Sequence, residues 1–486
     1  MSLAPLDLRP LVPAIIVAVT GVVVLLVQAF TPKGKTGPTA GLALGGIVAA
    51  LGTVMLIGGG WGRGATTGGS VAADDFALFF HGLLLAIAGV AVLLSPAYIK
   101  ATGIDRGEYY ALLLFSVVGM LGLASCLELV SLFVALEIMS IALYGLAGMH
   151  RSRVESQEAA LKYFVTGAFS SAFVLYGIAL LYGTTGSTSL PRIAARVAQL
   201  LPGETDMAVL GAGLLLVGFG FKVASVPFHM WAPDVYEGAP TTVTALMSAG
   251  VKAAAFAGLL RVFEQALPSL AREWQPAVAV LAIVTMVGGN LGALAQGNLK
   301  RMLAYSSVAH AGYLLTALVA APPVATEAVL FYLVGYAAVN LGGFGALAAL
   351  AKGDREPLSL SDVAGLAERR PALAAAFSVY LISLTGVPVS AGFVGKFYLF
   401  GAAVSAGWVT LAVVGVLMSV VSASYYLRVV VAMYMRDPVG EDDWAPVAPA
   451  SALALAVSVI VVLGLGVYPG PVLALARQAA RSLLST

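Results

Sequence analysis

The sequence predicts an all-α membrane protein with about fourteen transmembrane helices. Of its 486 residues, 60% are hydrophobic and only 10% are charged, and its mean hydropathy is +0.96. A protein of this composition needs a lipid bilayer as its solvent. The apolar runs are continuous and lack an alternating pattern, which favours helices over the strands of a membrane barrel. Runs of about 18 or more residues begin near positions 11, 38, 76, 109, 129, 160, 207, 240, 276, 302, 326, 371, 403 and 448.

The composition also excludes several kinds of partner and cofactor. The net charge is +2 and the basic residues are scattered among the connections, so nucleic acid is not expected as a partner. The single Cys126 can form neither an internal disulfide nor an iron–sulfur site, and we interpret it as a packing residue. The four histidines lie in separate segments, so we expect no bound metal or haem in this chain. They are His81, His150, His229 and His310.

Basic residues in the connections predict the orientation. The odd-numbered connections hold the larger set: Lys33, Lys35, Lys100, Arg106, Arg151, Arg153, Lys300, Arg301, Lys352, Arg355, Arg369, Arg370 and Arg436. Connections that are rich in lysine and arginine face the cytoplasm. With an even number of spans, both termini are therefore expected in the periplasm. The first run, 11–30, lacks the basic leading region and the cleavage site of a secretion signal, so we interpret it as a retained span.

Two proline-interrupted spans indicate an internal repeat. Pro227 and Pro388 lie about 160 residues apart in similar surroundings, and paired interruptions of this kind are typical of duplicated transporter halves. Proline removes a backbone N–H and frees a carbonyl one turn earlier, which is tolerated at membrane depth only in a polar or hydrated interior. Two ordinary helix kinks are the alternative.

Five ionisable residues lie inside or at the ends of the apolar runs. An ionisable group deep in a span costs about 2.5 to 3.5 kcal/mol on insertion scales. A carboxylate that faces a lysine can exchange protons with it, and a buried lysine without a partner can lose its proton near neutral pH. This set therefore favours the transport of a small ion such as the proton. Its members are Glu137, Lys162, Lys222, Lys252 and Lys396.

Each of these residues also has a structural interpretation. Lys162 lies near a helix end and could extend to the membrane surface, and the other four could form structural ion pairs. His229 and His310 could relay protons or serve as hydrogen-bonded packing residues. We interpret three further residues as anchors at the membrane interface: Trp231, Tyr236 and Arg261.

Five segments resemble the antiporter-like N-type subunits of bacterial NADH:quinone oxidoreductase, respiratory complex I. They are Ala135–Ser140, Ser156–Tyr163, Phe221–Pro240, Asn298–Ser307 and Ser383–Phe400. The resemblance covers roughly residues 110–430. Lys396 differs from the glutamate usual in M-type subunits, and the chain lacks the length of an L-type subunit. Val389 and Ser390 depart from the more usual Pro-Thr. Subunits of multisubunit (Mrp-type) cation/proton antiporters share the core and are the first alternative, and a passive membrane scaffold is the second.

The resemblance implies a domain plan and a role for each buried charge. The plan has a three-helix region at 1–108, two inverted five-helix halves at 109–265 and 276–436, and a final span with a tail at 437–486. Glu137 and Lys222 would form the central pair of the first half. Lys162 would stand near the proton input, Lys252 would connect the halves, and Lys396 would serve the exit side.

The resemblance also implies the setting in which the chain works. The protein would couple electron transfer in other subunits to proton transport in the bacterial cytoplasmic (inner) membrane. It would hold no redox centre, since NADH, FMN, the iron–sulfur clusters and quinone would belong to partner chains. Its membrane partners would be M-type, K-type and J-type subunits.

Overall fold

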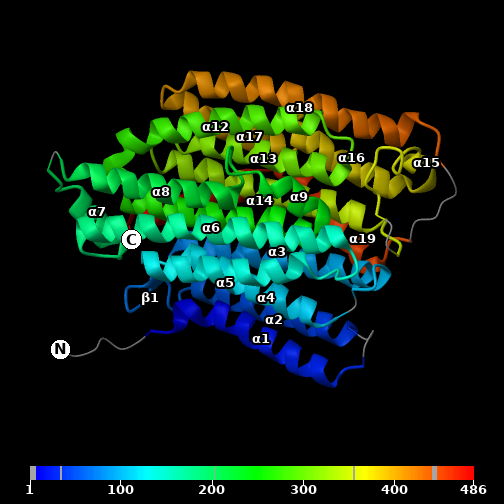
Figure 1. Ribbon diagram of the computed structural model, residues 1–486, viewed down its shortest axis with the longest axis horizontal. Coiled ribbons are helices and arrows are strands. Elements are labelled where there is room, and N and C mark those ends of the chain that lie inside the picture. Colours follow the sequence, from blue (N-terminus) through cyan, green and yellow to red (C-terminus); the bar gives the residue numbers. More distant parts are fainter. Residues whose placement is uncertain are drawn as a thin grey trace.

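A computed structural model describes residues 7–32, 36–104, 106–201, 203–353, 356–439 and 446–485. Its helices run largely along one direction and form an elongated bundle (Figure 1). The C-terminus lies at the same end of the bundle as α7 and β1, and α15 lies at the opposite end. Three basic residues used to predict the orientation, Lys33, Lys35 and Arg355, lie outside the described residues.

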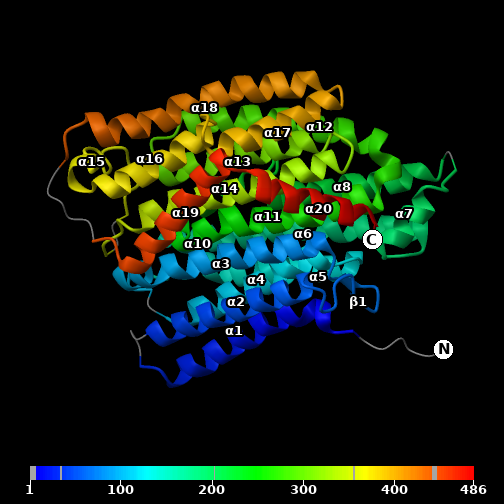
Figure 2. The same cartoon turned by 180° about the vertical axis from the view of Figure 1, so that it is seen from behind.

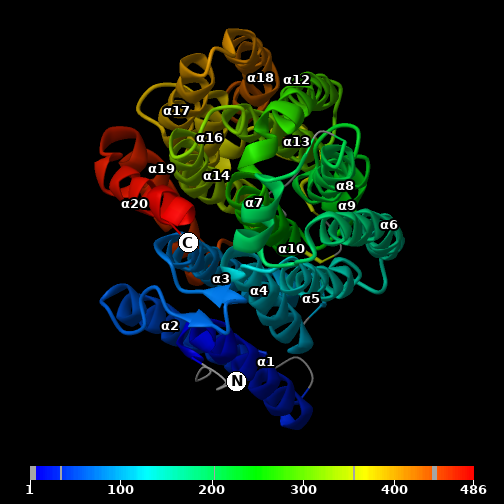
Figure 3. The ribbon, with the colours of Figure 1, turned by 90° about the vertical axis from the view of Figure 1, so that its left-hand side faces the viewer.

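The first part of the chain forms a layer at the edge of the bundle, seen end-on in Figure 3. It holds η1 (Arg9–Leu11), α1 (Val12–Phe30), α2 (Gly37–Gly58), the hairpin of β1 (Thr66–Thr67) and β2 (Val71–Ala72), and α3 (Asp75–Ala101). The two short antiparallel strands pair Thr66 with Ala72 and lie within a connection. Because α1 and α2 leave much of their apolar surface uncovered, they suit contact with lipid.

The first half of the bundle contains one interrupted helix. Its elements are α4 (Glu108–Ser125), α5 (Leu129–Ala147), α6 (Val154–Thr185), α7 (Leu190–Val197), α8 (Thr205–Val223), α9 (Trp231–Gly238), α10 (Thr241–Leu246), η2 (Met247–Val251), α11 (Lys252–Leu260) and η3 (Arg261–Ala266). The helix stops at Val223 and resumes at Trp231, with Pro227 between. The elements α10 to η3 form one span, 241–266, of which η2 and η3 are π-helical.

The second half repeats this interruption. It contains η4 (Pro268–Leu270), α12 (Ala271–Leu294), α13 (Leu299–Ala317), α14 (Val324–Ala348), α15 (Leu366–Arg369), α16 (Pro371–Thr385), α17 (Ala391–Ser405) and α18 (Val409–Met435). Here Pro388 lies between α16 and α17. The proline-interrupted spans predicted from the sequence are therefore broken helices in both halves.

The number of spans agrees with the prediction of about fourteen. In the described part of the chain, 12 helical stretches are long and apolar enough to cross a membrane. The more polar α13 and the interrupted pair α16 and α17 supply the remainder. The span 241–266 is entirely buried by its neighbours, and α14 is largely so, which makes these two the centre of the core.

The last residues form more structure than the predicted tail. After α19 (Pro449–Val467), the chain continues as α20 (Gly470–Ser485), which packs on α3 and α14 (Figure 2). Pro471 near the first turn suits a helix start, and buried side chains recur every three or four residues, at Leu473, Ala476, Ala480 and Leu483.

Candidate functional site: a buried row of lysines and hydroxyl groups

Lys222 lies in the last turn of α8, directly before the first break, and is 2% exposed. Its Nζ atom donates a hydrogen bond of 2.8 Å to the hydroxyl of Ser140 on α5. Three aromatic rings surround the ammonium group at 5.3 to 5.9 Å from their centroids, and such rings stabilise a cation without accepting its proton. They belong to Tyr144, Tyr163 and Phe221.

Glu137 lies on α5, one turn before Ser140. Its carboxylate accepts a hydrogen bond from Ser171 of α6. Among the described residues Glu137 and Lys222 do not form an ion pair with each other, so the expected central pair is not in direct contact. Ser140, which receives the Lys222 hydrogen bond, instead connects the lysine to the helix of the acid.

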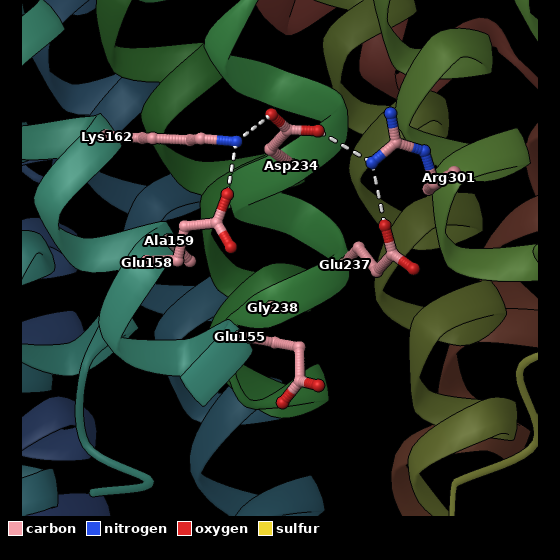
Figure 4. A pocket seen from close by; sticks show the side chains of 8 residues that line it. All are labelled: Glu155, Glu158, Ala159, Lys162, Asp234, Glu237, Gly238 and Arg301. Carbon is pink, nitrogen blue, oxygen red and sulfur yellow. Dashed lines mark hydrogen bonds and ion pairs between the residues drawn. The ribbon is translucent and has the colours of Figure 1, made fainter. Parts of the chain in front are cut away.

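Lys162 belongs to a cluster of charges where α6, α9 and α13 meet (Figure 4). Its Nζ atom is 2.6 Å from Glu158 and 2.5 Å from Asp234. Arg301 bridges Asp234 and Glu237, at 2.7 Å from each. The side chains surround a cavity of about 170 Å³. Lys162, whose side chain is 41% exposed, is thus held in an ion-pair network.

Lys252 lies in the centre of the bundle, directly after the π-helical segment η2, and is 2% exposed. Its ammonium group donates to the backbone carbonyl of Ser307 and, at 2.7 Å, to the hydroxyl of the same residue. Tyr336 of α14 donates to this hydroxyl at 2.8 Å. Ser307 therefore joins the span of Lys252 to α13 and α14.

His310 lies one turn beyond Ser307 on α13 and is buried. One ring nitrogen is hydrogen-bonded to the hydroxyl of Tyr332, and the other is 3.3 Å from the hydroxyl of Tyr426. Tyr426 also bonds to Ser306. This places His310 among hydroxyl groups that neighbour the Lys252 site.

Lys396 lies in the second turn of α17, shortly after the second break, and is 5% exposed. Its Nζ atom donates to the carbonyls of Leu384 and Thr385, at 2.9 and 3.0 Å. These are the last carbonyls of α16, which the interruption leaves without helical partners. The ammonium group also lies 4.7 Å from the centre of the Tyr313 ring. The break thus supplies the backbone acceptors that the sequence predicted there.

His229 stands apart from these lysines. It lies between α8 and α9, is partly exposed, and packs near Tyr305. Pro227 lines an apolar cavity of about 230 Å³ together with Phe228 and Trp231. The contacts of His229 include no hydrogen bond to Lys222 or Lys252 in the described part of the chain.

The prediction that Trp231, Tyr236 and Arg261 are anchors at the membrane interface is wrong. Arg261 is fully buried and forms an ion pair of 2.7 Å with Asp74, the N-cap residue of α3. Trp231 donates its indole N–H to the Phe221 carbonyl at 3.0 Å, and Tyr236 is buried. These side chains pack between helices of the same bundle and are covered from the membrane interface.

Sequence reasoning missed the hydroxyl groups that receive the lysine hydrogen bonds. Ser140 lies three positions after Glu137, and Ser307 lies three positions before His310, so each pair shares one helical face. That spacing is a signal that could have identified both serines. The tyrosines contributed by α14 and α18 have no comparable signal, because their partners are distant in sequence.

A second missed feature is a buried carboxylate, Glu356, at the end of the bundle where α15 lies. It accepts hydrogen bonds from Tyr98 at 2.6 Å and Thr241 at 2.5 Å, and it pairs with Arg153 at 3.0 Å and Lys300 at 3.4 Å. Burial by itself raises the pKa of this carboxyl group. The Lys300 charge and the hydrogen bonds outweigh that effect and lower the pKa to about 2.

A membrane bundle with two broken helices and buried lysines at hydroxyl groups and helix breaks defines an antiporter-like membrane subunit. The family model described as NADH:quinone oxidoreductase/Mrp antiporter, transmembrane, matches residues 126–422. NADH-quinone oxidoreductase subunit N of Trichlorobacter lovleyi is 45% identical over 98% of this chain and 97% of its own length. The subunit N of Chloroflexus aggregans is 46% identical over 91% of each chain. This chain belongs to the subunit N family of NADH-quinone oxidoreductase.

Solved structures agree with this placement. A chain of respiratory complex I from Thermus thermophilus, solved with bound aureothin, is 38% identical and superposes with a TM-score of 0.81 over 95% of this chain and 98% of its own. A chain of the Mrp complex from Dietzia sp. has a TM-score of 0.84 over 98% of this chain and 97% of its own, at 23% identity. The second likeness concerns the fold alone.

Proposed function

We propose that this chain transports protons as the N-type membrane subunit of NADH:quinone oxidoreductase, through a relay of buried lysines and Glu137. One observation carries the proposal. Lys222, Lys252 and Lys396 are all buried, and in the described contacts each donates to hydroxyl or carbonyl oxygens and none to a carboxylate. A buried lysine with a carboxylate partner is held protonated, whereas one with neutral partners can release its proton.

The order of the relay follows the positions of these groups. Lys162 and its charge network receive protons at the mouth between α6, α9 and α13. Glu137 and Lys222 exchange protons over the single helical turn that separates Glu137 from Ser140, the hydrogen-bond acceptor of Lys222. Lys252 and His310 continue through the centre, and Lys396 delivers protons on the exit side. Hydroxyl groups suit this task because each can donate and accept a hydrogen bond at the same time.

The redox reaction belongs to partner chains in this proposal. NADH, FMN, iron–sulfur clusters and quinone would be bound by other subunits, and M-type, K-type and J-type subunits would adjoin this chain in the bacterial inner membrane. The names of the relatives support this setting. The Mrp-type alternative is supported by the fold but has the lower sequence identity.

Lys252→Ala tests the proposal in the assembled complex reconstituted into vesicles. Loss of a residue that transfers protons should lower both quinone reduction and proton uptake, by at least about tenfold. Lys100→Ala is the matched control, because Lys100 is exposed at the end of α3. NADH oxidation with an artificial acceptor should stay unchanged in both variants and so reports assembly. Proton uptake at the parental rate in an assembled Lys252→Ala complex would refute the relay.

A further inference from the structure

Glu264 is a buried acid that the relay described above does not use. It lies in the π-helical segment η3, at the end of the central span, and is 3% exposed. One carboxyl oxygen accepts a hydrogen bond from the hydroxyl of Thr326 on α14. The other oxygen is buried and has no hydrogen-bond partner in the described structure.

No cation compensates this acid among the described contacts. Arg261, one turn earlier, is committed to Asp74 at 2.7 and 2.9 Å and to the Ala124 carbonyl at 2.7 Å. The elements around η3 do carry charged groups. Arg192 and Arg196 on α7 and Arg481 on α20 are exposed, while Arg477 on α20 pairs with Glu327 on α14 at 3.0 Å. A carboxylate buried without a cation bears a large desolvation cost, which the addition of a proton removes.

The position of Glu264 connects the centre of the bundle to one end. It follows Lys252 by twelve residues on the same span, or about 18 Å along a helix. Thr326, its hydrogen-bond donor, is the neighbour in sequence of Glu327, whose ion pair with the exposed Arg477 reaches the surface. π-helical segments occur directly before Lys252 and around Glu264, and such segments are frequent at functional sites.

We propose that Glu264 is a further proton-binding site, which lies between the lysine relay and the end of the bundle that carries the C-terminus. Binding breaks an O–H bond of a protonated water that has taken its proton from the lysine relay, and it forms an O–H bond at the Glu264 oxygen that lacks a partner. Release breaks that bond and passes the proton to water near the Glu327–Arg477 pair, and no electrons move. The inference rests on the proposed proton transport and adds a site to it.

The test compares Glu264→Gln with Glu264→Asp in the assembled complex in vesicles. An infrared pH titration should show a carboxyl band that Glu264→Gln abolishes and Glu264→Asp retains at a shifted position. Proton translocation should fall by about tenfold or more in the Gln variant and recover in part in the Asp variant. Glu273→Gln, at an exposed acid in the first turn of α12, should change neither readout.

Two results would overturn this inference. One is parental pumping by the assembled Gln variant, and the other is an equal loss in the Gln and Asp variants, which would indicate a packing role. If the Glu264→Gln complex does not assemble, the Glu264→Asp variant decides the question. A carboxyl band at the parental position together with parental pumping in that variant would contradict the proposal. The Lys252→Ala variant separates the two proposals. If Lys252→Ala loses proton pumping while Glu264→Gln keeps it, the Glu264 site is rejected and the lysine relay stands.

Discussion

Glu137 and Lys222 are connected only indirectly, and this arrangement determines what each can contribute to proton transfer. Lys222 is held by a neutral hydroxyl, so its charge is not fixed by a bonded carboxylate. Glu137 is held by the hydroxyl of Ser171 and keeps acceptor capacity for a proton. In the proposed relay a proton passes between them when the Ser140 hydroxyl, which here donates to the Leu136 carbonyl, turns toward Glu137. If Glu137 and Lys222 instead formed a direct salt bridge, that bridge would have to break before either group could pass on a proton.

Glu137→Gln should stall proton transport more than Glu137→Asp. An amide can still accept the Ser171 hydrogen bond but cannot bind and release a proton, whereas a shorter carboxylate can. We expect quinone reduction and proton uptake to fall by about tenfold or more in the Gln variant. Glu108→Gln, an exposed acid in the first turn of α4, is the control. Parental pumping rate and ratio in the assembled Gln variant would make Glu137 a structural residue.

At this scale the sequence predicted the charges better than their partners. Lys222, Lys252 and Lys396 were recognisable because a charge within an apolar run has a large cost and needs a reason. Serine and tyrosine have a small free-energy cost of insertion in such a run. Nothing in the sequence therefore singles out Ser307 or Tyr332, and their roles are visible only in the packed structure. Which oxygen a lysine reaches depends on tertiary structure.

The two broken helices end in a similar way but with different residues. Ala224 ends α8 in the left-handed conformation, with φ of 59°, and Gly386 ends α16 in the same region, with φ of 91°. Left-handed backbone costs a residue with a Cβ atom about 1 to 2 kcal/mol and costs glycine little. The second break avoids this strain at the helix end, but it holds Val389 in the left-handed region three residues later, with φ of 70°.

Exchanging the residue type at each break should have unequal effects on stability. Gly386→Ala should destabilise the protein by about 1 to 2 kcal/mol, and its Cβ would lie 3.1 Å from the Lys396 side chain. Ala224→Gly should change stability by less than about 0.5 kcal/mol, because relief of strain offsets the lost methyl group and the added freedom of the unfolded chain. Thermal unfolding of the detergent-solubilised complex measures both. Equal destabilisation would contradict this account.

Elements were predictable where a strong local signal exists. The long apolar runs predict the spans, and the prolines within them predict both helix breaks. The π-helical segments around Lys252 and Glu264 have no such signal, since their residues suit an ordinary α-helix and the shift in register comes from packing. The helix α20 is not predictable as a span, because its 16 residues mix arginines with alanines and leucines and form no apolar run of the length that a span needs.

At the scale of the whole molecule, both ends of the described chain lie at the same end of the bundle. The backbone carbonyl of Asp7 accepts a hydrogen bond from Thr67 beside the hairpin, and Ser482 of α20 bonds to the backbone of Asp75. The side of the membrane on which this end lies stays a prediction from the basic connections. We expect a periplasm-only reporter fused to the C-terminus to be active. Activity of a cytoplasm-only reporter there would reverse the orientation.

The junction around Glu356 could not be predicted from the sequence. Tyr98, Arg153, Thr241 and Lys300 come from the N-terminal layer and both halves of the bundle, and Tyr98 is 258 positions away from Glu356. Lys300, which the sequence places in an odd-numbered connection, is buried in the first turn of α13. Only the assembled bundle brings one acid within reach of all four groups.

Glu356→Gln should therefore destabilise the molecule as a whole. It leaves the buried Lys300 charge without its carboxylate, a loss of about 3 kcal/mol or more. Because the folded pKa of about 2 lies below the ordinary value of 4.5, the contribution of Glu356 is complete above pH 4.5 and disappears as the pH falls toward 2. The difference in stability between parent and variant should shrink over that range, as measured by denaturation at several pH values. Glu368→Gln, at an exposed acid of α15 on the same end, should show no such difference. If the difference in stability between the parent and Glu356→Gln stays constant down to pH 2, the carboxylate charge does not hold these helices together.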